Sequence, residues 1–215
     1  MSTDAKQFVQ CVRAVREYGA EISAMGETLD ALFLQELGKA RPVCKVVGSM
    51  VWDDRDDDQG WVCTDISASI PLARRKGSRP EMYLSYQVSL EGNGMEFPGN
   101  EVPLLHVCLW DCPIDFNEGF FVKHPMKFSN GAEDEQRVEA DRLIVWDGEG
   151  TNWKQREWTF SVELLSLESS QALLDRVVKP AIALLNGEPA GTALPDAMRG
   201  LFRHSSQRVG ERHDT

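Results

Sequence analysis

The chain has 215 residues, of which 42% are hydrophobic and 27% charged, and its formal net charge is −11. This composition is that of an ordinary globular protein, and it excludes collagen-like, repetitive and low-complexity classes. Because binding to phosphate requires Lys and Arg, so acidic a chain is not expected to bind nucleic acid directly. Acidity favours a partner with a basic surface, imitation of a phosphate array or a metal cation, or it serves solubility alone.

The sequence predicts a cytoplasmic protein. Its first residues, MSTDAKQF, lack the basic and apolar regions of a secretory signal. No stretch reaches the roughly 18 apolar residues that cross a membrane, so no membrane contact is expected. The five cysteines are irregularly spaced, which favours reduced thiols over a secreted disulfide framework. A bacterial source is also expected, although no particular residue indicates it.

Residues 1–40 have a helical pattern. Apolar residues recur at steps of three and four from Phe8 to Leu32, which places them on one stripe of a helix. Gly19 and Gly26 interrupt this pattern and predict two helices rather than one. Gly38 and Pro42 mark the expected end.

From Pro42 the period changes to two, which predicts strands. In residues 81–90, EMYLSYQVSL, apolar side chains alternate with polar ones, as in an antiparallel strand with one face in the core and one in water. The short connections predict a meander, since sequential strands tend to be neighbours. The seven strands are expected at 43–52, 61–70, 81–90, 104–110, 119–123, 142–147 and 153–165.

A second helical part follows the sheet. Ser169 or Ser170 can cap a helix that Pro180 should kink and that Asn186-Gly187 ends. A short helix is expected from Pro195 to about Arg203. The sequence thus predicts one α+β domain, with an antiparallel β-meander covered by an N-terminal helical segment and a C-terminal helix. Its expected parts are 1–204 as the domain, 1–40 as helical, 43–165 as sheet, 169–204 as helical, and 205–215 as a disordered tail.

A cluster of aspartates begins the sheet: VWDDRDDDQGW, residues 51–61, holds five aspartates within six residues and a tryptophan on each side. In a meander, the acidic turns at 53–58, 91–103 and 124–141 would share one end of the sheet, and the basic turn at 74–79 would lie at the other. This asymmetry predicts a docking face for a basic protein, although solvated loops carry such charges too. The residues of this face are Asp53, Asp54, Asp56, Asp57, Asp58, Trp52, Trp61, Glu133, Asp134 and Glu135.

Two further patterns are partial matches to metal sites. Asp54, Asp56 and Asp58 alternate and Asp65 follows, as in a calcium loop, but Gln59 stands where that loop needs glycine. A solvated hairpin turn explains this pattern better. His106, Cys108 and Cys112 offer zinc ligands without an accompanying CxxC pair, so a core strand explains them at least as well. No cofactor is predicted.

The sequence carries no catalytic signature: GxSxG, GxxxxGK, HExxH and GxGxxG are all missing. We therefore expect a non-enzymatic protein–protein interaction module, such as an adaptor, a chaperone or an immunity-type inhibitor. The alternative is a small-molecule-binding or enzymatic domain whose cavity lies between the sheet and the C-terminal helix, and a weaker one is a metal-dependent hydrolase. The expected cavity residues are Tyr86, Trp158, Phe160, Val177 and Ala181. The oligomeric state and the identity of the partner stay open.

Overall fold

The chain folds as one antiparallel sheet backed by helices, and a computed structural model describes residues 5–39, 44–90, 102–122, 136–146 and 156–204. The first half contains α1 (Ala5–Lys39), β1 (Lys45–Val46), β2 (Val51–Asp56), β3 (Cys63–Ala73), β4 (Met82–Ser89) and β5 (Leu104–Trp110). The second half contains β6 (Gln136–Glu139), β7 (Leu143–Trp146), β8 (Glu157–Glu163), the 3₁₀ turn η1 (Leu164–Ser166), α2 (Ser170–Leu173), the π-helical turn η2 (Leu174–Val178), α3 (Lys179–Leu185) and α4 (Ala190–Ala193).

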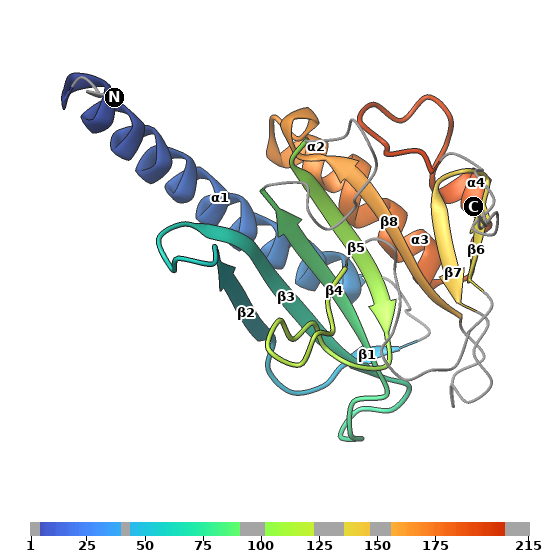
Figure 1. Ribbon diagram of the computed structural model, residues 1–215. Helices are drawn as coiled ribbons and strands as arrows, with labels where there is room; N and C mark the ends of the chain where they lie inside the picture. The colour runs from blue at the N-terminus through green and yellow to red at the C-terminus, as the bar shows by residue number, and fades with distance from the viewer. Residues whose placement is uncertain (1–4, 40–43, 91–101, 123–135, 147–155, 205–215) are drawn as a thin grey trace, which may run out of the picture.

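The strand order in the sheet is β1-β3-β4-β5-β8-β7-β6, and β2 pairs with β3 beside β1. The predicted α+β fold, in which an antiparallel sheet follows one helical part in the chain and precedes another, is therefore confirmed. β3, β4 and β5 are neighbours, as a meander requires. The last strands depart from chain order, because β8 inserts between β5 and β7 and leaves β6 at the far edge (Figure 1).

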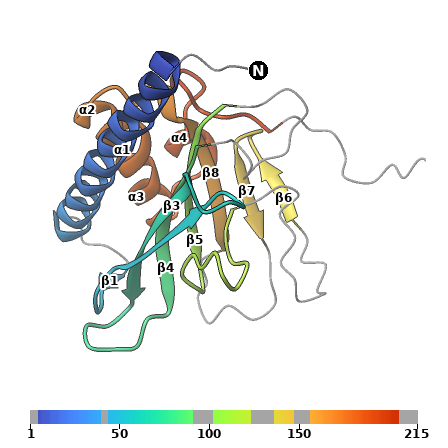
Figure 2. The same ribbon diagram turned by 60° about the vertical axis from the view of Figure 1, so that its left-hand side comes forward.

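One face of the sheet is covered by α1 and the C-terminal helices, which lie side by side (Figures 1 and 2). The core between these two layers is built from the apolar residues of the alternating strands and from the inner faces of the helices. Its largest fully buried side chains include Tyr86, Phe33, Phe160, Leu29 and Ile70.

The C-terminal helix begins and ends as the sequence predicts. Ser169 caps it, with its side-chain oxygen accepting from Ala172 N at 3.2 Å. Gly187 ends it with a φ of 86°, and its N–H donates to Leu184 O at 2.9 Å. Before Pro180, which lacks an N–H, the helix widens into the π turn η2, and this takes the place of the predicted kink.

The prediction of two N-terminal helices is wrong, because α1 is a single helix of 35 residues. Gly26 does not break it but lets it approach the sheet closely. An added Cβ at Gly26 would lie 3.4 Å from the Tyr86 hydroxyl, which donates to Gly26 O at 3.2 Å. Gly26 therefore serves the close contact between α1 and the sheet and does not mark the end of a helix.

Several strand and helix predictions need correction. The strand expected at 43–52 is divided into β1 and β2 by Gly48, whose φ is 79°, and β2 continues to Asp56, so most of the expected aspartate turn is strand. Residues 119–123 make only an isolated bridge between Asp115 and Phe120 within their described part. The strand β6 was not predicted. The helix expected at 195–203 is replaced by turns after α4.

The predicted charge asymmetry between the two ends of the sheet holds only in part: the β2–β3 hairpin lies at the end opposite the basic 74–79 turn, but the chain does not enter β6 at the hairpin's end. Gln136, the first residue of β6, pairs with Trp146, which pairs with Glu157 at the start of β8. Antiparallel pairing therefore brings the chain into β6 at the end of the sheet where β5 finishes, which is the end of the basic 74–79 turn. The acidic residues Glu133, Asp134 and Glu135, and the tail 205–215, lie outside the described residues.

The second face of the sheet is buried as well, so the expectation of a wet face is wrong. The polar side chains of β4 on this face are at most 1% exposed. Segment 111–122 covers them: Val122 N donates to Gln87 Oε1 at 2.8 Å, and Ile114 N donates to Ser69 Oγ at 3.0 Å. The alternation in β4 therefore separates two covered faces of different polarity.

Candidate interaction surface

The aspartates of the VWDDRDDDQGW stretch divide into structural and exposed groups. Alternation along β2 turns Asp53 toward segment 111–122, where its Oδ2 accepts from Phe116 N at 2.7 Å. Asp54 and Asp56, on the other side of β2, are exposed, and so is Asp58 in the following turn. Only these last three carboxylates are available to a partner.

Asp57 holds the hairpin turn between β2 and β3. Its carboxylate accepts from Trp61 N at 2.7 Å and from Val62 N at 3.3 Å. Gly60, with a φ of 68°, supplies the left-handed residue that closes the turn. The prediction of a hairpin turn is thus correct for residues 57–62, and the turn fixes the backbone from which Trp61 projects.

Asp65 is a buried structural residue, only 1% exposed. Its carboxylate pairs with Arg55 at 2.5 Å and accepts from Gln87 Nε2 at 2.9 Å. The Arg55 guanidinium in turn lies 4.8 Å from the centre of the Phe121 ring. These contacts lock the hairpin to segment 111–122, and they leave Asp65 no room to act as a ligand in an exposed calcium loop.

The predicted tryptophans differ in exposure. Trp61 is 86% exposed, the highest value among the large apolar side chains that are described, and Trp52 is 51% exposed. Trp52 is anchored nonetheless, since its ring meets Tyr86 edge-on at 6.4 Å. Both belong to the β2–β3 hairpin, so its exposed surface combines indole rings with carboxylates.

Among the described residues, the one group of three acidic, Cys or His side chains that could hold a metal is Asp54, Asp56 and Cys63, with ligand atoms within 4.8 Å of one another. Burial, and then the two carboxylates, raise the pKa of the Cys63 thiol. The thiol is therefore protonated at neutral pH, and it donates to Asp65 O at 3.3 Å. Asp58 is not part of the group, so the predicted ligand set is only partly brought together.

The zinc pattern lies deep in the sheet. His106 and Cys108 share one face of β5, as alternation predicts, and both are fully buried. Burial lowers the pKa of His106 to about 3 and raises the pKa of Cys112 to about 12. His106 Nδ1 lies 2.8 Å from Ser161 Oγ, which gives the ring a partner within the sheet. These features are those of a buried structural strand.

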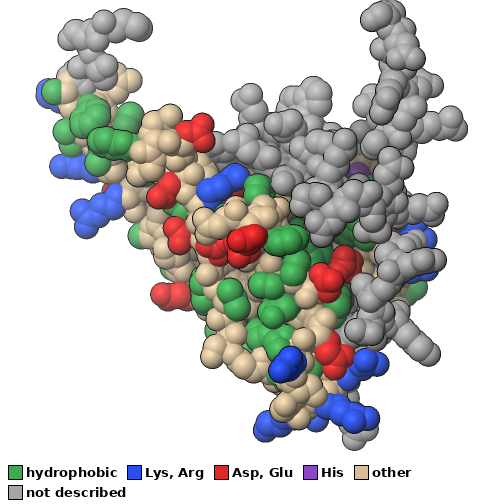
Figure 3. All heavy atoms as spheres, turned by 60° about the horizontal axis from the view of Figure 1, so that its bottom comes forward, with side chains coloured by type: hydrophobic (Ala, Val, Ile, Leu, Met, Phe, Trp, Pro, Cys, Tyr) green, Lys and Arg blue, Asp and Glu red, His purple; other side chains and the backbone are tan. Residues whose placement is uncertain are grey.

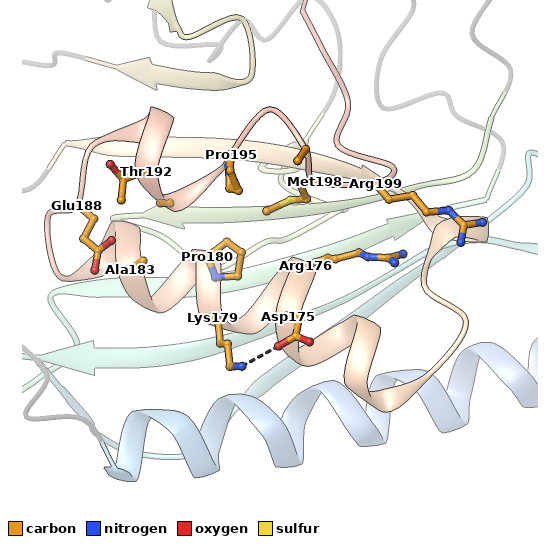
Figure 4. A pocket seen from close by; sticks show the side chains of 12 residues that line it. Asp175, Arg176, Lys179, Pro180, Ala183, Glu188, Thr192, Pro195, Met198 and Arg199 are labelled. Atoms are coloured by element: carbon orange, nitrogen blue, oxygen red, sulfur yellow. Dashed lines mark hydrogen bonds and ion pairs between the residues drawn. The ribbon is translucent and has the colours of Figure 1, made fainter.

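The residues expected to line a ligand cavity pack in the main core, where Tyr86, Phe160, Val177 and Ala181 are at most 1% exposed. A pocket of about 450 Å³ lies instead on the outer side of α3, between this helix and residues 188–199 (Figure 4). Two of its cationic side chains are paired, Lys179 with Asp175 at 2.7 Å and Arg199 with Glu168 at 2.8 Å. At the predicted positions, therefore, core side chains take the place of a cavity.

The outer half of α1 is a feature that the sequence interpretation missed. The whole apolar stripe was expected to face the core, but Phe8, Val12, Val15 and Tyr18 are all more than half exposed. Helix length could have revealed this: 35 residues of helix span about 52 Å, whereas the 11 residues of β3 span about 36 Å. The first turns of α1 project beyond the sheet (Figures 1 and 2).

Comparison with known proteins gave no match. No protein-family model, no curated protein and no solved structure matches this chain. Within the described residues, no helix combines the length and the apolar composition needed to cross a bilayer. Function must therefore be argued from the surface itself.

Proposed function

We propose that the protein is a non-enzymatic protein–protein interaction module that docks a basic partner on its β2–β3 hairpin. The observation that carries this proposal is the combination, in one hairpin, of the 86%-exposed Trp61 with the exposed carboxylates of Asp54, Asp56 and Asp58. An indole face attracts Lys and Arg, and carboxylates pair with them. A surface that offers both suits a basic partner.

The charge of this hairpin is not neutralised within the described chain. No Lys or Arg of the described residues lies within 4.0 Å of Asp54, Asp56 or Asp58. Acidic side chains are spread over this side of the molecule between apolar ones (Figure 3). With a net charge of −11, the protein would steer a basic partner toward itself over about a Debye length.

The hairpin is also held by internal hydrogen bonds and an ion pair, which should lower the entropic cost of docking. Asp57 fixes the turn, and the Arg55–Asp65 pair ties β2 to the buried side of β3. In this proposal the protein is an adaptor, chaperone or immunity-type inhibitor of a bacterial cytoplasm. All five of its cysteines are free, which fits a reducing compartment. Specific metal binding, predicted at Asp54, Asp56, Asp58 and Asp65, is a separate prediction that this proposal does not need.

The test is quantitative affinity capture from the native cells with matched variants. The hairpin variant carries Asp54→Asn, Asp56→Asn and Asp58→Asn together with Trp61→Ala. The control carries Glu118→Gln, Glu163→Gln and Glu188→Gln, three exposed carboxylates elsewhere on the molecule. We expect the wild type and the control to recover the same basic protein, which elutes as salt rises, and the hairpin variant to lose it at least tenfold.

The proposal would be contradicted if the hairpin variant and the control recovered equal amounts of the basic protein. In that case the carboxylates serve solubility or protect an edge strand, and the hairpin variant should aggregate sooner than the control at high concentration. Both variants should unfold at nearly the same urea concentration as the wild type, because every substituted residue is exposed.

A further inference from the structure

The apolar stripe of α1 follows a heptad pattern over more than half of the helix. Its residues alternate steps of four and three: Phe8, Val12, Val15, Gly19, Ile22, Gly26, Leu29 and Phe33. Such spacing keeps one seam of a helix facing one partner helix or layer. The seam is therefore continuous, although its two halves meet different surroundings.

The inner half of the seam is buried and the outer half is not. Leu29 and Phe33 are at most 1% exposed, whereas Phe8 is 64% and Val12 is 54% exposed. Residues 5–21, before the point where Ile22 packs against the core, form about 25 Å of projecting helix. A helix of this length without packing is marginal in water, so an unpartnered seam is an unfavourable end state.

We propose that a second copy of the chain covers this seam, with the two outer halves of α1 packed antiparallel. In an antiparallel pair, the residues that alternate along the seam face each other in layers. The longest overlap of the exposed halves puts Val12 opposite Val15 of the second copy. The same register puts Phe8 opposite Gly19 and Ala5 opposite Ile22.

These layers match large side chains with small ones. An added Cβ at Gly19 would meet nothing within 4 Å, so space for the Phe8 ring of the second copy is open there. Beside the seam, Arg16 falls next to Val9 and Cys11 falls next to Tyr18, so no like charges oppose each other. A parallel pair would instead stack Phe8 on Phe8 and leave a void between two glycines.

Charge also selects the antiparallel arrangement. Residues 5–22 carry three basic and two acidic side chains, while the whole chain carries −11. Basic and apolar side chains line the projecting end of α1, at the upper left of Figure 3. Antiparallel packing joins the two molecules through this end and keeps their acidic bodies at opposite ends of the pair. Parallel packing would bring the acidic bodies together.

The dimer should be reversible. A stable interface buries about 800 Å² per partner, and a two-helix contact of this length offers less, so we expect a dissociation constant on the order of 10–100 µM. The proposal does not depend on the basic partner of the β2–β3 hairpin, because it concerns the purified chain alone.

Sedimentation velocity of the purified full chain over about a hundredfold range of concentration tests the dimer. The seam variant carries Phe8→Ser and Val12→Ser. Its control carries Gln7→Ser and Gln10→Ser, which lie on the opposite face of the same turns and are exposed. We expect the wild type and the control to approach twice the monomer mass, and the seam variant to need at least tenfold more protein.

Cross-linking tests the register. Tyr18→Cys places a new thiol opposite Cys11 of the second copy, and Cys11 is free and exposed. Under mild oxidation this variant should form a covalent dimer much faster than the wild type, in which the two Cys11 residues are held apart. A wild type that stays monomeric, a seam variant that dimerises as well as its control, or a rapid Cys11–Cys11 cross-link would each overturn the proposal. Association only with a foreign helical protein would do the same.

Discussion

The two faces of the sheet are both buried, yet they are built from opposite chemistry. On the helix side, the central strands present apolar residues such as Ile70, Leu84 and Phe160. On the opposite face of the same strands, a polar row crosses the sheet through β3, β4, β5 and β8. It consists of Ser67, Gln87, His106 and Ser161, which are direct neighbours in the strand pairing.

The difference lies in how each face is held. The helix side depends on apolar area, which is non-directional and tolerant of small shifts. The other side depends on hydrogen bonds that must be made, since an unpaired buried polar group costs about 1–3 kcal/mol. Segment 111–122 makes many of these bonds, and an apolar cluster around Trp110 and Trp146 supports it on β5 and β7. Substitutions on the two faces should therefore fail in different ways.

The largest effect is expected on the helix side. Phe160→Ala should lower the free energy of unfolding by about 3–5 kcal/mol, because it leaves a cavity in the middle of the core. The control is its neighbour on the opposite face, Thr159→Val. The Thr159 hydroxyl is buried and has no hydrogen-bond partner among the described residues, so its removal should leave stability unchanged or slightly raised. Urea unfolding measures both, and equal losses would contradict the comparison.

On the polar side, Gln87→Leu should lower the free energy of unfolding by about 2–4 kcal/mol. The substitution removes a hydrogen-bond partner from the buried Asp65 carboxylate and from the buried Val122 N–H. Its signature should be local. Amide exchange at Val122 should become faster relative to the helix-side strands, since Gln87 holds segment 111–122 to the sheet. Phe160→Ala should accelerate exchange throughout the sheet, and an identical exchange pattern in the two variants would remove the distinction.

The sequence predicts the helix side well and the polar side poorly. Period-two alternation located β3, β4 and β8, and the Ser169 cap and Asn186-Gly187 end located the C-terminal helix. Alternation cannot say whether a polar row faces water or another covered layer. That depends on segment 111–122, whose contacts are distant in sequence and follow no period.

The candidate surface was predictable only in part. The exposed carboxylates of the hairpin follow from composition, whereas the exposure of Trp61 does not. The roles of Asp53, Asp57 and Asp65 depend on partners up to 63 residues away. The order of the last strands was beyond local pattern as well, because β8 is drawn to β5 by pairing across a long connection. For that reason the sequence misplaced the entry into β6, although it placed the acidic hairpin and the basic 74–79 turn at opposite ends of the sheet.

The stability of the protein should depend on pH in opposite directions on the two faces of the sheet, although less strongly than on the substitutions above. His106, in the polar row, has a pKa lowered to about 3 from an ordinary 6.5, mainly because burial disfavours its charged form, with Asp65 opposing and His204 adding to the shift. The unfolded chain binds this proton more tightly than the folded chain does. The stability that neutral, buried His106 contributes is therefore present above about pH 6.5 and is lost as the pH falls. From about pH 6.5 to about pH 4.5, the wild type should lose about 2–3 kcal/mol more than His106→Gln.

Asp30, on the helix side, should have the opposite and smaller effect. Burial raises its pKa from 3.8 to about 6, opposed by the hydrogen bond from the Tyr86 hydroxyl and assisted by Glu27. The folded chain binds this proton more tightly, so the stability it contributes is present below about pH 4 and is lost as the pH rises through about 6. Asp30→Asn keeps an oxygen acceptor for Tyr86, and it should be more stable than the wild type above pH 6 by no more than about 1 kcal/mol, given the screening of a half-exposed group. Urea unfolding near pH 4 and above pH 6 measures this difference in stability, which should vanish near pH 4. An advantage that persisted in acid would mean that Asp30 acts through packing beneath α1 rather than through its charge.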